Sequence, residues 1–125
     1  MYVNKKQAMN IAVRVNRDEK IDYFAITNRI YEDSRLTPEA RNVWIQLIRP
    51  KNNLYKADEA QIRIDACVGM HKYIAAKQIL VAAGYIFRTH KNSTEMYVGI
   101  PGLDGFDPIE MYKADHPGYK DEEQG

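Results

Sequence analysis

The sequence predicts an α+β fold of one domain, with three to four helices followed by a C-terminal β-hairpin. The chain of 125 residues is long enough for one modest hydrophobic core and too short for two. Two stretches place apolar residues at helical spacing, and a third alternates apolar with polar residues on both sides of the polar run KNST. We therefore expect a flexible segment over residues 1–10, a folded domain over 11–100 and an acidic, mostly extended tail over 101–125.

The first ordered elements are a short strand and a short helix. IAVRV, which begins at Ile11, alternates as a strand does, and a helix over 5–15 is the alternative. After the turn NRDEK, Thr27 can cap a helix over 28–33. Two residues of this helix would face inward, Ile30 and Tyr31.

The clearest helix start lies in LTPEARNVWIQLIRP. Thr37 is suited to the N-cap, Pro38 to the first turn, and Glu39 to the positive end of the helix dipole. Pro50 ends the helix, because the residue before a proline is driven out of the helical region. Apolar residues then recur at i, i+3, i+4, i+7 and i+8, so one stripe faces the core: Ala40, Val43, Trp44, Leu47 and Ile48.

Two more helices are expected after KNNLY, which reads as a loop. Asp58 can cap the first, and the alternation in QIRID makes a strand the alternative there. The inward residues of this helix would be Ala60, Ile64, Cys67 and Val68, with Cys67 a small buried residue at its end. The second helix follows Gly69 and covers 70–83, with one buried face: Tyr73, Ala76, Leu80 and Ala83.

Gly84 lies where a helix ends in a left-handed conformation, and a hairpin follows it. Its strands are expected over 85–90 and 95–100. The tip of this hairpin would carry His90, Lys91 and Asn92. Beyond Ile100 the chain is rich in Gly, Pro and Asp, and four of its side chains could dock part of the tail: Phe106, Ile109, Met111 and Tyr112.

The charges are divided unevenly along a chain whose formal net charge is only +1. Residues 1–100 hold 16 Lys and Arg against 10 Asp and Glu, a net charge of +6, whereas residues 101–125 hold 2 against 7, a net charge of −5. A basic folded part can bind a polyanion, and an acidic tail can compete for that surface or recruit replication or transcription proteins. The alternative is that the tail only aids solubility.

The order of helix, glycine turn, helix and hairpin predicts a winged helix-turn-helix. The outer face of the second helix would then present His71, Ala75, Gln78 and Ala82, a narrow face that fits a DNA major groove. His71 and Gln78 are candidates for contacts with base edges. Phosphate contacts are expected from Lys72, Lys77, Arg88 and Lys91, beside His90 and Asn92 at the tip of the hairpin.

These segments resemble the winged-helix domain of phage and plasmid replication initiators and replisome organisers. The resemblance covers about residues 11–100. It rests on Phe24, Ile26 and Asn28, on Leu36, Thr37, Ala40 and Arg41, and on Leu80, Gly84, Tyr85, Ile86 and Arg88. It implies a protein that binds double-stranded DNA in a sequence-specific or structure-specific way and acts in replication initiation or transcriptional regulation of a mobile element. A winged-helix module that binds other proteins without DNA is the alternative.

Other function classes lack a signal in the sequence. No spacing of His, Cys and carboxylates suits a metal, and no nucleophile has recognisable partners, so we expect neither an enzyme nor a cofactor. No run approaches the length of a membrane span, and with a single cysteine and no signal peptide the expected compartment is the cytoplasm. A homodimer is common among such proteins, and the N-terminal segment could supply its contact.

Overall fold

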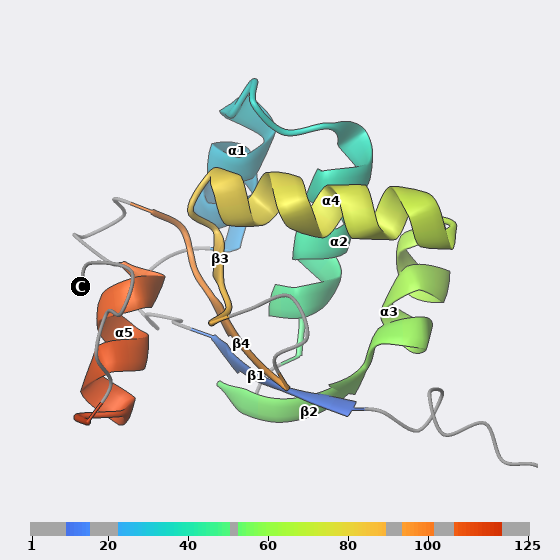
Figure 1. The fold of residues 1–125 in the computed structure, drawn as a ribbon. Coiled ribbons are helices and arrows are strands. Elements are labelled where there is room, and N and C mark those ends of the chain that lie inside the picture. Colours follow the sequence, from blue (N-terminus) through green and yellow to red (C-terminus); the bar gives the residue numbers. More distant parts are fainter. Residues whose placement is uncertain (1–9, 16–22, 51–52, 90–93, 102–106, 119–125) are drawn as a thin grey trace, which may run out of the picture.

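The computed structural model describes residues 10–15, 23–50, 53–89, 94–101 and 107–118. These residues form five helices and a four-stranded sheet, which confirms the α+β class (Figure 1). In chain order the elements are β1 (Asn10–Val15), α1 (Tyr23–Glu32), α2 (Pro38–Ile48), β2 (Leu54–Asp58), α3 (Glu59–Ala66), α4 (Met70–Ala82), β3 (Ile86–Phe87), β4 (Glu95–Val98) and α5 (Pro108–Asp115).

The sheet has the strand order β2-β1-β4-β3. β1 pairs antiparallel with β2 and parallel with β4, so the expected N-terminal strand forms and lies inside the sheet. β3 pairs antiparallel with β4, with Phe87 opposite Tyr97. Alternate residues of β1 and β4 are buried on the same face as the main core: Ile11, Val13, Val15, Met96 and Val98.

α2 packs at the centre of the helical layer. The Thr37 hydroxyl accepts a hydrogen bond from the Ala40 amide at 3.1 Å, as the N-cap prediction requires. All five residues of the predicted stripe are buried, and Trp44 is 1% exposed. The ring of Trp44 meets the ring of Tyr85 edge to face at 5.9 Å, which joins α2 to the segment that leads into β3.

α1 differs from the predicted short helix in both its start and its face. It begins at Tyr23, so Thr27 lies inside the helix and does not cap it. Ile30 is fully buried as predicted, whereas Tyr31 is 55% exposed and has the Arg41 guanidinium 5.8 Å from its ring centre. Neighbouring residues of a helix are about 100° apart, so a helix that buries Ile30 turns Tyr31 away from the core.

The expected loop before α3 contains a strand, β2, whose five residues pair with β1. Asp58 at the end of β2 caps α3 as predicted, because its carboxylate accepts a hydrogen bond from the Ala60 amide at 2.9 Å. The predicted inward face of α3 is wrong for Ile64 and Cys67, whereas Ala60 and Val68 are half-buried and Val68 packs against the core. Ile62 and Ala66 are buried, while Ile64 is 63% exposed and Cys67 is exposed at the C-cap.

α4 and the turn after it agree closely with the sequence-based interpretation. Tyr73, Ala76, Leu80 and Ala83 are buried, and α4 packs across α2. Gly84 has a φ of 89°, and a Cβ at this position would lie 3.3 Å from the Pro101 side chain. Glycine is therefore favoured at this position for two reasons: the backbone is left-handed, and Pro101 lies close to it.

The hairpin forms, but its paired strands are shorter than expected, since β3 has two residues and β4 has four. The predicted tip, with His90, Lys91 and Asn92, lies outside the described residues.

The expectation of a mostly extended chain after Ile100 is wrong for residues 108–115, which form α5. The Asp107 carboxylate caps this helix at the Ile109 amide, and Pro108 is at its start. The ring of Tyr112 lies 5.2 Å from Phe87 and 5.2 Å from Tyr97, so α5 packs on the face of β3 and β4 opposite to the main core. Tyr112 and Met111 are half-buried, Ile109 is 41% exposed, and Phe106 lies outside the described residues.

Candidate nucleic-acid interface

The outer face of α4 is the centre of the candidate site. The burial of Tyr73 and Leu80 against α2 fixes the rotation of α4, so the opposite side of the helix faces solvent. Figure 1 shows that α4 forms the outermost layer over α2. Four residues at the predicted outward positions are exposed: His71, Ala75, Gln78 and Ala82. The structure thus brings together the two candidate base readers, His71 and Gln78, on one accessible surface.

Three large apolar side chains that were not among the predicted site residues lie beside this face. Met70 is 56% exposed, Ile74 is 45% exposed and Val81 is 42% exposed. Their positions at i, i+4 and i+11 place them on one edge of the helix, which we call the α4 apolar stripe. The sequence signal was present, because each of the three lies outside the buried face of Tyr73, Ala76 and Leu80.

Lys72 lies on the other side of the outward face. Its ammonium is 3.7 Å from a carboxylate oxygen of Glu39, and its side chain is 70% exposed. An ion pair this exposed contributes little to stability, so the lysine can exchange its partner at small cost. Lys72 is therefore accessible to an anion such as phosphate.

Lys77 is held in a different way. Its ammonium donates a hydrogen bond to Glu59 Oε2 at 2.8 Å, and the same oxygen accepts a hydrogen bond from the Tyr73 hydroxyl at 2.6 Å. The Lys77 side chain is only 16% exposed, and its ammonium lies 4.9 Å from the centre of the Tyr73 ring. Lys77 therefore joins α4 to the start of α3 and points away from the exposed face.

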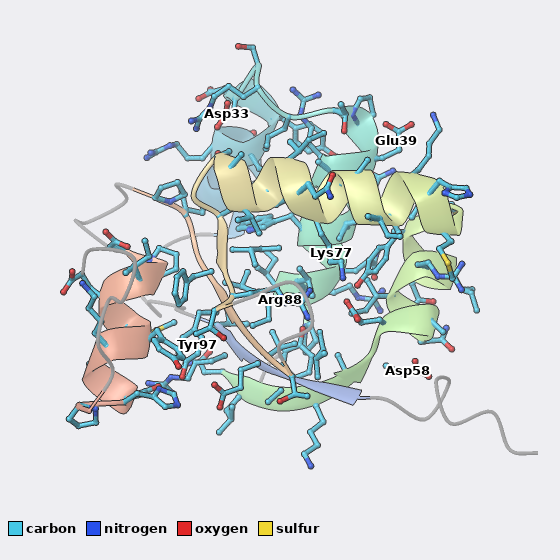
Figure 2. All side chains as sticks on the ribbon, in the orientation of Figure 1. Asp33, Glu39, Asp58, Lys77, Arg88 and Tyr97 are labelled. Carbon is cyan, nitrogen blue, oxygen red and sulfur yellow. The ribbon has the colours of Figure 1, made fainter. Side chains whose placement is uncertain are left out.

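The charges around Glu59 explain its ionisation. Burial would raise the pKa of this carboxyl, but the hydrogen bonds from Lys77 and Tyr73 outweigh burial and lower it. Arg88 acts in the same direction through its charge. Burial and the Glu59 charge raise the pKa of Tyr73 far above its usual range, so the phenol stays a hydrogen-bond donor. Figure 2 shows Lys77 and Arg88 beneath α4, on the side away from Glu39.

The predicted site residues therefore separate into two groups. His71, Lys72, Ala75 and Gln78 share the exposed side of α4. Lys77 and the half-buried Arg88 lie around Glu59, between α3, α4 and the hairpin. The structure does not describe His90, Lys91 or Asn92.

The described residues include no cluster of three or more His, Cys, Asp or Glu side chains that could hold a metal ion. A hollow of about 370 Å³ lies beside Arg49 and Tyr55, and another of about 200 Å³ lies beside Arg14 and Tyr97; neither is lined by α4. No described helix has both the length and the apolar character needed to cross a bilayer.

Comparison of the chain with protein-family models, with curated proteins and with solved structures gives no significant match.

Proposed function

We propose that this protein binds double-stranded DNA as a winged helix-turn-helix, with α3 and α4 as the helix pair and the β3–β4 hairpin as the wing. α4 would enter the major groove and place His71 and Gln78 against base edges. The proposed role is replication initiation or transcriptional regulation of a phage, plasmid or other mobile element, in keeping with the family resemblance of residues 11–100.

One observation carries this proposal. α4 turns a narrow face of His71, Ala75, Gln78 and Ala82 to solvent, directly before a glycine turn and an antiparallel hairpin. Two of these residues are alanines, so the backbone of the helix can approach bases closely. Gln78 offers both a donor and an acceptor, which suits the N6 and N7 edge of adenine.

The residues that we propose to contact phosphate differ from those expected from the sequence. We assign the phosphate contacts to the exposed Lys72 and to Lys91, because the half-buried Arg88 lies beside Glu59, away from the outward face of α4. Lys77 is better suited to holding α3 against α4, because Glu59 and Tyr73 already surround its ammonium. A phosphate would have to displace a partly buried ion pair to reach it.

A fluorescence anisotropy titration with duplex DNA at two salt concentrations tests the function. Binding should weaken as salt rises, by about 0.9 log unit per neutralised phosphate for each tenfold increase in salt. Absence of binding to any duplex at low salt would reject the proposal.

A pair of variants tests the assignment of roles. Gln78→Ala should reduce the preference among DNA sequences, and Lys72→Ala should weaken binding about equally on all of them. Equal behaviour of the two variants would show that α4 does not read bases through this face.

A protein-binding module without DNA contact is the second candidate, and the α4 apolar stripe is the observation that favours it. Exposed apolar side chains gathered on one helix edge are typical of protein interfaces. Size-exclusion chromatography with light scattering provides the test. A stable dimer that Ile74→Asp converts to a monomer, together with no DNA binding, would show that the stripe is a protein interface and favour this candidate.

A further inference from the structure

The α4 apolar stripe lies along the same helix as the candidate base readers, and this placement is the basis of a more specific inference. Ile74 is four residues before Gln78, and Val81 is three residues after it. Residues three and four apart are neighbours on a helix surface. Gln78 is therefore flanked on one edge by two branched apolar side chains, which are 45% and 42% exposed.

The α4 apolar stripe lacks the hydrogen-bond donors that a phosphate-binding surface needs. Met70, Ile74 and Val81 offer no hydrogen-bond donor. In the DNA major groove, the apolar feature that such side chains can contact is the C5-methyl group of thymine. Adenine, the base suited to Gln78, is paired with thymine, so both groups would be met in the same base pairs.

The dimensions of the stripe agree with this occupant. From Met70 to Val81 the helix rises about 16 Å at 1.5 Å per residue. This length corresponds to roughly five base-pair steps of 3.4 Å. Charge also agrees on one side, because the 70% exposed Lys72 side chain lies beside the outward face and can meet one phosphate backbone.

We infer that the α4 apolar stripe selects thymine-containing sites by contact with thymine methyl groups, with Ile74 as the central specificity residue. The inference rests on the proposed function, because it assigns a target class to the same DNA-binding face. It predicts a preference for A·T pairs that is set in the major groove. The methyl group, and not the minor-groove width, would be the feature recognised.

The test compares alternating adenine–thymine duplexes with alternating adenine–uracil duplexes, which lack only the thymine methyl groups. The wild-type chain should bind the thymine duplex more tightly, by about fourfold for each methyl group that becomes buried. Guanine–5-methylcytosine duplexes, which carry a methyl group at the equivalent position, should also bind more tightly than guanine–cytosine duplexes.

Two variants make the test specific to the stripe. Ile74→Ala should bring the ratio of thymine to uracil affinities closer to one. Ile64→Ala removes an even more exposed isoleucine from α3, outside the stripe, so it should leave that ratio unchanged. Circular dichroism checks that both variants are folded, which the exposure of both side chains leads us to expect.

The outcomes separate the inference from the function. Binding to DNA with equal affinity for thymine and uracil duplexes would overturn the inference and leave the proposed function standing. Binding to no duplex would overturn both. A stripe that covers a second copy of the chain would appear as a dimer that Ile74→Ala weakens, with no difference between thymine and uracil, and would also overturn the inference.

Discussion

Asp33 connects three parts of the chain through one carboxylate. Arg35 donates to it from its backbone amide and its guanidinium, and the Tyr85 hydroxyl donates to Oδ2 at 2.8 Å. The backbone carbonyl of Asp33 accepts a further hydrogen bond from Arg41, on α2, at 3.1 Å. One residue after α1 thus fixes that turn against α2 and against the segment that leads into β3.

The Asp33 contacts predict a pH dependence of stability. The Arg35 hydrogen bond lowers the pKa of Asp33 from its ordinary value of 3.8; partial burial opposes this shift, and Tyr85 adds to it. A carboxyl whose pKa is lower in the folded chain than in the unfolded chain stabilises the fold at pH values above its unfolded pKa. This contribution is lost as the pH falls from the unfolded pKa through the folded pKa.

Asp33→Asn should therefore reduce the free energy of unfolding by roughly 1–3 kcal/mol at pH 7. The difference from wild type should narrow as pH falls below about 3.8. Urea denaturation at pH 7 and pH 3 measures both values. Glu32→Gln neutralises an exposed neighbouring carboxylate and serves as the control. A difference that stays constant with pH would contradict the role of the charge.

Cys67 occupies a conformation that suits glycine. It is the C-cap of α3, with φ 61° and ψ 43°, in the left-handed region. A side chain in this region costs roughly 1–2 kcal/mol. The buried role that we expected for this residue is wrong, because Cys67 lies exposed at the C-cap, where the backbone leaves the helical conformation.

Cys67→Gly should stabilise the fold by about 1 kcal/mol, since glycine adopts the left-handed region without strain. The midpoint of urea denaturation measures the gain. Cys67→Ala removes the same thiol but keeps the Cβ, so it should give no gain. Equal stability of the two variants would show that the strain is not present.

At the scale of elements, α5 depends on a small aromatic cluster. The Tyr112 ring contacts Phe87 and Tyr97 and stacks on His116 at 4.2 Å. The Asp115 carboxylate lies 2.7 Å from Arg14 Nε on β1 and accepts a hydrogen bond from the Tyr97 hydroxyl. Burial and the Asp115 charge raise the pKa of Tyr97 to about 12. α5 is thereby joined to three of the four strands.

Tyr112→Ala should detach α5 and lower the free energy of unfolding by about 2 kcal/mol, because aromatic pairs contribute roughly 0.5–1.5 kcal/mol each. Ile109→Ala, on the exposed side of the same helix, is the matched control and should change little. Hydrogen exchange of the α5 amides measures the detachment. Equal protection in the two variants would exclude a role for the cluster.

At the scale of the whole molecule, the structure divides the acidic C-terminal segment into two parts. The acidic segment is not uniform, because residues 108–115 are packed on the sheet while residues 119–125 follow the described part of the chain. A truncation after Gly118 therefore removes acidic residues and leaves α5 in place. Competition between these residues and DNA can then be tested without loss of the aromatic cluster.

The chain truncated after Gly118 should bind duplex DNA several-fold more tightly at low salt if the acidic residues compete with phosphate. The gain should disappear at high salt, because screening shortens the reach of charges. Anisotropy titrations at both salt concentrations measure it. An unchanged affinity at low salt would leave solubility as the role of this segment.

The sequence by itself determined the elements whose signals lie in neighbouring residues. The Thr37 cap and the five-residue stripe specify α2, the Tyr73, Ala76 and Leu80 spacing specifies the buried face of α4, and Gly84 specifies the turn after it. The exposed side of α4 followed from that buried face. In each case a repeat or a cap within one segment is sufficient, because the helix geometry relates its residues to one another.

Tertiary structure decided the features that depend on distant partners. β2 is a strand because β1 pairs with it, and α3 buries Ile62 instead of Ile64. Asp107 and Pro108 are a local signal for the start of α5, but its packing on the sheet depends on the contacts of Tyr112 with Phe87 and Tyr97. Lys77 was expected to contact phosphate, but in the folded chain it forms an ion pair with Glu59, a residue distant in the sequence. A local pattern cannot supply such partners, since burial and ion pairing are set by which segments meet in the folded chain.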